Sequence, residues 1–106
     1  MLSVAKALSD QFGPHGIRVN SVSPGPVRTA LWDGPGGRAV RLAEQFGMDD
    51  EEQAVAHFAK HIRRMPLGRI GQPEEIAWVV LFLASDRASF VTGSEYTVNG
   101  GSLRAC

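Results

Sequence analysis

The chain has 106 residues with 11 basic and 11 acidic side chains, so its formal net charge is zero. That length corresponds to one domain or part of one. Because no basic block stands out, the composition argues against binding of nucleic acid or of an anionic membrane surface. The single cysteine, Cys106, offers neither a disulfide framework nor a metal-ligand set, which suits a protein of the reducing cytoplasm.

The apolar stretches argue against a membrane protein. Lys6 and Asp10 interrupt the N-terminal stretch, so the sequence predicts no signal peptide. The most apolar run, residues 76–84, is far too short to span a bilayer.

The N-terminal residues predict a helix. Apolar side chains recur at helical spacing over residues 1–12, and Gly13-Pro14 ends the pattern. The pattern is already present at Met1, with no capping residue before it. We therefore expect a helix entered partway along, with Met1 as an internal methionine used as a start.

A strand and a loop follow. Residues 17–23 form the predicted strand, which the run Pro24-Gly25-Pro26 ends because proline cannot donate to a ladder. Thr29 can then cap a short helical turn that includes Leu31 and Trp32.

The middle of the chain predicts two helices. The first covers residues 38–46 and ends at Gly47. Asp49 and Glu52 have capping-box spacing and open the second. Its apolar stripe consists of Val55, Phe58, Ile62 and Met65.

The last third predicts one more helix and one more strand. Pro73 stands at the first helical position, and the helix is apolar on nearly all sides over residues 76–84. Residues 95–98 alternate as a final strand. The order helix, strand, helices, strand predicts the α/β class, with parallel strands joined by a helical crossover. Two strands alone cannot make such a sheet, so earlier partners are expected.

Four groups of residues resemble the short-chain dehydrogenase/reductase family, in the same order and with the same gaps. The strings are Ala5-Lys6-Ala7-Leu8 with Gly16-Ile17-Arg18-Val19-Asn20, then Ser23-Pro24-Gly25-Pro26-Val27-Arg28-Thr29, then residues 66–77 (PLGRIGQPEEIA), then residues 81–86 (LFLASD) with 91–93 (VTG) and 98–101 (VNGG). The resemblance implies that residues 1–106 are the C-terminal portion of a single Rossmann-fold domain, a doubly wound parallel sheet.

The resemblance also implies an activity for the parent protein. Members transfer a hydride between NAD or NADP and a carbonyl or alcohol substrate, using a serine and a Tyr-x-x-x-Lys motif. The only tyrosine here is Tyr96, in the final strand, and no lysine follows it. We therefore assign no catalytic residue and expect the chain by itself to be inactive. The competing interpretation is a truncated, non-catalytic chain that only binds or assembles.

The candidate cofactor residues are in the loop after the first predicted strand. By resemblance, Pro24 and Gly25 shape this loop along the nicotinamide, Val27 binds the carboxamide through its backbone, and Thr29 offers its hydroxyl. From the residues alone, the favoured interpretation is a strand-ending turn in which Thr29 caps a helix, and the resemblance reverses that preference for the parent protein. A reuse of the scaffold without redox chemistry, as in a dehalogenase or a regulatory sensor, is disfavoured because the Pro-Gly-x-Val-x-Thr pattern is kept.

Residues 30–65 correspond by resemblance to a substrate lid. Its candidate substrate-facing side chains are Leu31, Trp32, Phe46 and Met48, with Trp32 the strongest because it follows the cofactor loop. Phe58 and Met65 are expected to pack the lid instead.

Two further expectations concern metals and assembly. His57 and His61 lie one helical turn apart, but no Glu follows His57 and no third ligand is evident, so we expect no metal site. The family resemblance implies a homo-oligomer, a dimer or tetramer, in which residues 76–84 and the final strand form a contact.

Overall fold

The computed structural model describes residues 2–102, with side chains from residue 4 onward. The expectations for Met1 and Cys106 therefore lie outside the described residues. The chain divides into two compact units. The first unit comprises the residues up to Pro24 together with Glu74–Val98. The second comprises Gly25–Pro73 and the residues from Asn99 onward.

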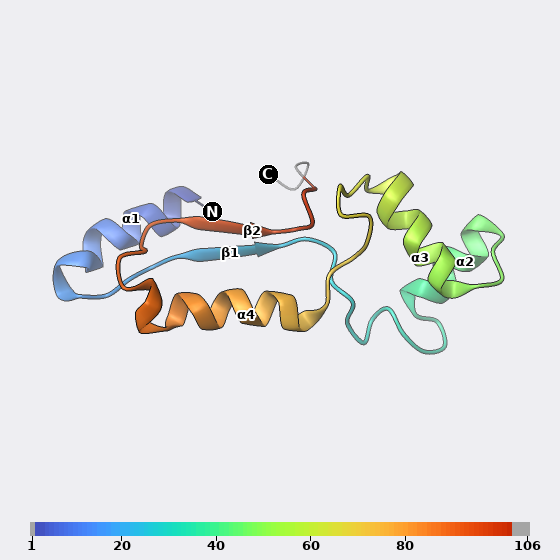
Figure 1. The fold of residues 1–106 in the computed structure, drawn as a ribbon, viewed down its shortest axis with the longest axis horizontal. Helices are drawn as coiled ribbons and strands as arrows, with labels where there is room; N and C mark the ends of the chain where they lie inside the picture. Colours follow the sequence, from blue (N-terminus) through green and yellow to red (C-terminus); the bar gives the residue numbers. More distant parts are fainter. Residues whose placement is uncertain (1, 103–106) are drawn as a thin grey trace. The chain divides into compact units, whose positions relative to one another are not determined.

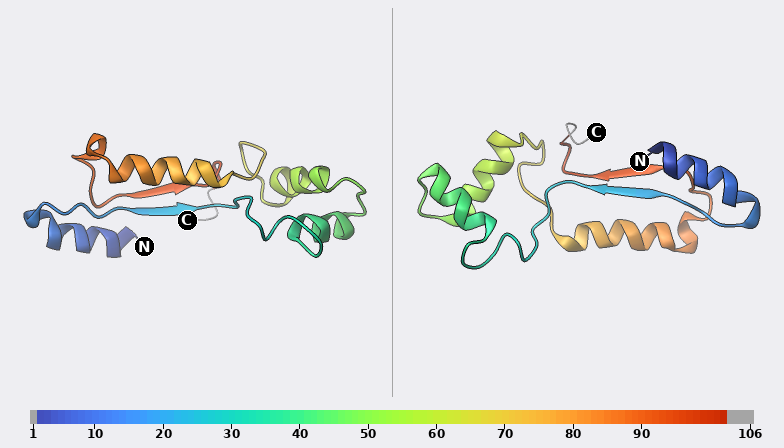
Figure 2. Two further views of the ribbon diagram at one scale, coloured as in Figure 1. Left: turned by 90° about the horizontal axis from the view of Figure 1, so that it is seen from below. Right: turned by 180° about the vertical axis from the view of Figure 1, so that it is seen from behind.

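The first unit is a pair of parallel strands with a helix on each side. Its elements are α1 (Leu2–Phe12), a 3-10 turn (Gly13–His15), β1 (Ser21–Pro24), α4 (Pro73–Ala84), a 3-10 turn (Asp86–Ala88) and β2 (Glu95–Val98). The strands pair from Ser21 with Glu95 to Pro24 with Val98 (Figure 1). Helices α1 and α4 flank the strand pair on opposite sides (Figure 2). This arrangement confirms the predicted α/β class and the parallel pairing.

The strand predicted over residues 17–23 is shorter and later than expected, because β1 begins only at Ser21. The residues just before β1 form hydrogen bonds with the loop that precedes β2, instead of pairing with another strand. Val19 donates its N–H to Thr92 Oγ1 at 3.0 Å and accepts from Gly93 N at 2.7 Å. Asn20 binds Val91 O and Ser94 N through its side-chain amide. The apolar pattern could not reveal these side-chain bonds across more than 70 residues.

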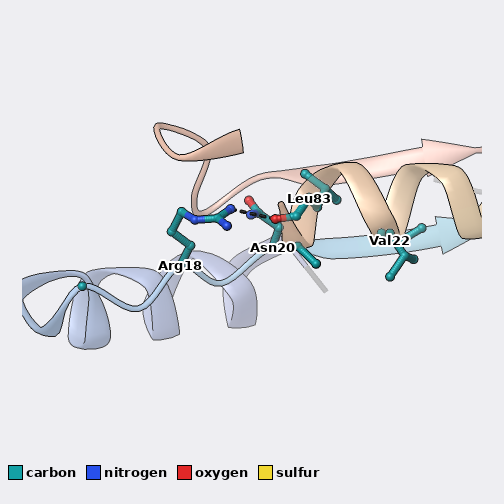
Figure 3. Close-up of a pocket in the computed structure, with 7 residues that line it drawn as sticks. Arg18, Asn20, Val22 and Leu83 are labelled. Carbon is teal, nitrogen blue, oxygen red and sulfur yellow. Dashed lines mark hydrogen bonds between the residues drawn. The ribbon is translucent and has the colours of Figure 1, made fainter. Parts of the chain in front are cut away.

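Helix α4 begins at Pro73, as predicted, and its last turn is bound by an arginine. Arg18 donates to Leu83 O at 2.8 Å (Figure 3). It also donates to Ser85 O at 3.2 Å. A cation at this end suits the helix dipole. Of the apolar side chains of α4, only Leu83 is buried, while Trp78 and Leu81 are each 65% exposed. Among the described residues, therefore, nothing covers most of the apolar surface of this helix.

The second unit is helical and has its own core. Helix α2 (Arg38–Phe46) ends at Gly47, as predicted, and lies beside α3 (Glu51–His57), which continues into a π-helical turn (Phe58–Ile62) (Figure 1). The core side chains are Trp32, Ala39, Leu42, Ala43, Ala54, Val55, Phe58, Ala59, Met65 and Ile70. The Trp32 and Phe58 rings meet edge to face at 5.8 Å, and the Arg38 guanidinium lies 5.2 Å from each ring centre.

Two details of the predicted lid helix were wrong. The N-cap is Asp50 rather than Asp49, because the Asp50 carboxylate accepts the Glu52 N–H at 2.9 Å. Ile62 is 54% exposed, although the periodicity placed it in the buried stripe. The reason is the π-helical turn, in which Arg63 N bonds Phe58 O five residues back and so shifts the later side chains around the axis.

Within residues 2–102, no helix has the length and apolarity needed to cross a bilayer.

Candidate functional site

The loop that carries the predicted cofactor residues starts where β1 ends, at Pro24. Its next residues run alongside the turn at Gly71. Arg28 N donates to Gly71 O at 2.8 Å, and Gly71 N donates to Pro26 O at 2.9 Å. Val27 and Gly71 therefore form a parallel β-bridge. The loop is an extended segment held along one edge, in the place where α/β sheets carry ligand-binding loops, beyond the carboxyl end of a strand.

Gly25 is fixed by the close approach of another backbone. A Cβ on Gly25 would lie 2.8 Å from Asn99 Cα and 2.7 Å from Asn99 Cβ. Asn99 is itself held, because its side chain donates to Ser102 O at 2.8 Å and accepts from Gly101 N at 3.1 Å. Only glycine fits at this position without moving the Asn99 turn.

The bridge leaves one backbone edge of the loop free. Pro26 and Arg28 supply the groups that bond Gly71, so the N–H and C=O of Val27 between them point the other way. Within the part of the chain that the structure describes, neither group of Val27 has a hydrogen-bond partner. A donor and an acceptor next to each other match the carbonyl and NH₂ of a carboxamide.

Thr29 is exposed and lies at the start of the turn predicted from the sequence. Its carbonyl accepts from Trp32 N at 2.9 Å, and its hydroxyl accepts from Leu31 N at a long 3.4 Å. The hydroxyl hydrogen has no acceptor among residues 2–102, so it can be donated to a ligand. The capping role and the ligand role are therefore compatible.

Arg28, which the sequence interpretation gave no role, is the most connected side chain of the loop. It donates to Asp33 Oδ1 from Nε at 3.2 Å and from Nη2 at 2.7 Å. Its Nη1 lies 2.9 Å from both carboxylate oxygens of Glu52. The hydrogen bond to Asp33 above all, and then the bond to Glu52, raises the pKa of Arg28 above its already high ordinary value in spite of partial burial. The guanidinium therefore stays charged over the whole pH range in which proteins are folded.

The predicted lid residues divide by exposure. Leu31 is 80% exposed, whereas Trp32 is only 7% exposed. Phe46 and Met48 are half-buried and pack against the core that contains Trp32. Phe58 and Met65 are buried, as expected of residues that pack the lid. The burial of Trp32 leaves little of its surface for a substrate, so its contact with substrate stays a prediction.

Of two hollows in the structure, one adjoins the site. One, of about 210 Å³, adjoins the cofactor loop and the lid. Its lining residues are Arg28, Glu52, Val55, Ala56, Gly68, Arg69, Ile70 and Gln72. A larger one, of about 380 Å³, lies in the first unit between the β1 region and α4, where Arg18, Asn20, Val22 and Leu83 face it (Figure 3). It contains none of the predicted site residues.

The histidine pair does not gather further ligands. The rings of His57 and His61 are 4.9 Å apart, and Phe46 packs edge to face on His57. In the described range 2–102, no three His, Cys, Asp or Glu side chains are placed to hold a metal ion.

The sequence interpretation missed Arg28, Gly71 and Asn99 as parts of the site. Gly71 and Asn99 appeared only within the strings that carry the family resemblance, and no pattern told which segment each would meet. Arg28 stood in the motif string, and a charged residue inside an otherwise apolar loop was the one signal available.

Known proteins match this chain over nearly its whole length. The family model for enoyl-(acyl carrier protein) reductase matches residues 1–102. Cyclohexanol dehydrogenase of Acinetobacter sp. (strain SE19) is 42% identical over 97 residues, which are 92% of this chain and 30% of that protein. The chain spans about a third of the length of the curated relatives it matches.

Solved structures match the fold. An NADPH-bound short-chain oxidoreductase with an atypical catalytic centre, from Pseudomonas aeruginosa PAO1, superposes with a TM-score of 0.74 and 33% identity, over 94% of this chain and 34% of that one. A 4-hydroxyisoleucine dehydrogenase complexed with NADH superposes with a TM-score of 0.67 and 29% identity, over 97% of this chain and 36% of that one. The chain therefore belongs to the short-chain dehydrogenase/reductase family.

Proposed function

We propose that this chain forms the nicotinamide side of the active site of an NAD(P)-dependent oxidoreductase, together with the lid over its substrate. The cofactor, when bound, supplies the hydride that is exchanged with a carbonyl or alcohol. The chain's own residues bind and orient the cofactor and cover the substrate. NADPH and NADH are each bound by a similar solved structure, so either is the candidate here.

The observation that carries the proposal is the free backbone edge of Val27. The loop is held in an extended form by Gly71, which leaves the Val27 N–H and C=O unpaired among the described residues. These groups fit the carboxamide of nicotinamide, which has one acceptor and two donors. Thr29, two residues on, adds an exposed hydroxyl whose hydrogen has no acceptor among residues 2–102. Together these groups would hold a bound cofactor by its carboxamide.

The lid is the second part of the proposal. We assign residues 30–65 to it, because they follow the loop directly and form a helical unit with a separate core. Leu31 offers exposed apolar surface at its start, and Phe46 and Met48 are the half-buried side chains at the end of α2. A lid of this kind excludes water from the transfer.

A second candidate function is non-catalytic assembly. Its support is the absence of a Tyr-x-x-x-Lys motif from the sequence, together with the exposed apolar side chains of α4. It predicts association with an intact family member but no cofactor binding that depends on Thr29.

The two functions are separated by titrating NADH and NADPH into the protein encoded by the longest open reading frame that contains this chain. Thr29→Ala removes one hydrogen bond to the cofactor, worth about 0.5–1.5 kcal/mol, and so raises the dissociation constant up to about tenfold. Ser89→Ala, which removes an exposed hydroxyl outside the loop, the lid and the expected subunit contact, is the control and leaves the constant unchanged. If both variants and the unmodified protein have equal dissociation constants for the cofactor, Thr29 only caps the helical turn. That result would favour the assembly function.

A further inference from the structure

We propose that Arg28 is a positioning residue that couples the cofactor loop to the lid, so that removing Glu52 from the lid weakens cofactor binding at the loop. The inference rests on the proposed function for the identity of the ligand of the loop. The coupling itself rests on the geometry of Arg28, Asp33 and Glu52.

The direction of the Arg28 side chain is set by the extended loop. Successive side chains of extended backbone point to opposite sides. Val27 and Arg28 are therefore on alternate sides, and the Arg28 side chain leaves the side on which Thr29 offers its hydroxyl. It reaches the lid instead, where both of its carboxylate partners stand.

The two partners belong to separate parts of the lid. Asp33 is five residues from Arg28, in the turn that follows the loop, and Glu52 is 24 residues away, in the first turn of α3. One planar guanidinium uses Nε and Nη2 on Asp33 and Nη1 on Glu52. Lysine has a single ammonium and cannot reproduce this fork, so the arrangement is specific to arginine.

The exposed fractions of the three side chains show which of them is held most firmly. The Arg28 side chain is only 19% exposed, while those of Asp33 and Glu52 are 57% and 67% exposed. The guanidinium is thus held in place by its surroundings, and the lid carboxylates attach to it from the solvent side. The backbone of Arg28 is also fixed, since its N–H bonds Gly71 O at 2.8 Å. When the loop moves, Arg28 therefore moves with it, and so does the group that pairs with Glu52 in α3.

Coupling of this kind is reciprocal. If the ordered lid favours the loop conformation that binds cofactor, then bound cofactor orders the lid by the same factor. The factor is modest, because partly exposed ion pairs are screened by water and salt.

The first test is hydrogen exchange on the chain without ligand. Glu52→Gln removes one partner and leaves no buried charge, so the chain keeps its fold. We expect amides of residues 51–57 to exchange about two- to fivefold faster. Glu51→Gln removes the same charge from the same helix end, where no ion pair to Arg28 exists, and serves as the matched control. In an Arg28→Gln background, Glu52→Gln should add nothing further. Equal effects of the two glutamate variants, or full additivity with Arg28→Gln, would overturn the coupling.

The second test asks whether the coupling reaches the ligand. NADH or NADPH is titrated into the protein of the longest open reading frame. Glu52→Gln should weaken binding about two- to fivefold, Glu51→Gln should not, and Arg28→Lys should not restore the loss seen in Arg28→Gln. Failure of all variants to bind cofactor would refute the proposed function and leave the exchange result to decide the coupling. Tight binding that Glu52→Gln does not change would refute the inference alone.

Discussion

Gly25 and Asn99 approach each other so closely that a single added carbon would bring Gly25 within 2.7 Å of the Asn99 side chain. Asn99 cannot easily retreat, because its amide closes the turn through Ser102 O and Gly101 N. That turn also lies against Pro66, since a Cβ on Gly101 would lie 2.8 Å from the Pro66 ring. Gly25, at the start of the cofactor loop, is therefore packed closely against the turn that begins at Asn99.

We predict that Gly25→Ala destabilises the protein by about 1–3 kcal/mol, the usual cost of overpacking. The clash is with backbone and Cβ atoms, so no side-chain rotation relieves it. Chemical denaturation followed by tryptophan fluorescence measures the change. Gly13→Ala is the control, because nothing lies within 4 Å of a Cβ there and its φ is negative. An unchanged midpoint for Gly25→Ala would mean that the Asn99 turn is free to move.

The lid core gives a prediction that separates the observed helix from the one expected from periodicity. Phe58 is 5% exposed and meets the Trp32 ring, whereas Ile62 is 54% exposed. We expect Phe58→Ala to lower the free energy of unfolding by about 3–5 kcal/mol. We expect Ile62→Ala to change it by no more than about 0.5 kcal/mol. Urea unfolding of the two variants at equal ionic strength provides the comparison. Similar losses of stability at both positions would contradict the prediction, because they would mean that Ile62 is buried as in a regular α-helix.

The sequence predicted most of the scaffold, because its signals are local. Gly47 and Pro73 mark helix ends that the structure confirms to the residue. The final strand, Glu95–Val98, and the α/β order were likewise predicted correctly. Each of these rests on a property of a few neighbouring residues: a left-handed cap, a missing N–H, or alternation.

The details that the sequence did not predict depend on contacts between distant residues. Thr92 and Asn20 replace the expected first half of β1 by side-chain bonds. The π-helical turn turns Ile62 to solvent, and nothing in the spacing of apolar residues distinguishes it from a regular turn. Arg28 finds Glu52 over 24 residues. A pattern of residue types holds no record of which segments will meet.

The 106-residue chain should show no dehydrogenase activity. Its only tyrosine, Tyr96, is half-buried in β2, and no Tyr-x-x-x-Lys motif exists to protonate a substrate oxygen. The expectation is checked by incubating the purified 106-residue chain with NADH, NADPH and a panel of ketones and alcohols, following absorbance of the reduced cofactor. A family member with the full motif serves as the positive control. Turnover that copurifies with the chain through two independent columns would contradict the prediction.

The chain by itself should also self-associate, through the first unit rather than the second. The second unit has a core of its own, whereas the first exposes a row of large apolar side chains on α4. Trp78 and Leu81 are each 65% exposed and Phe82 is 46% exposed. Apolar surface of this extent marks an interaction site or an aggregation liability.

The strands add to this tendency. Within residues 2–102 the sheet has only β1 and β2, so each strand keeps one edge with unpaired backbone groups. Such edges are templates for pairing with another chain, and two strands fall short of the three or more that make a stable sheet. Light scattering after size exclusion should therefore give a mass above the 11.4 kDa of the monomer. Leu81→Glu should lower that mass by charging the α4 surface, whereas Leu31→Glu, at a still more exposed position outside α4, should not. A monomer at all concentrations, with slowly exchanging amides in both strands, would contradict the prediction, because it would mean that helix packing alone protects a two-stranded sheet.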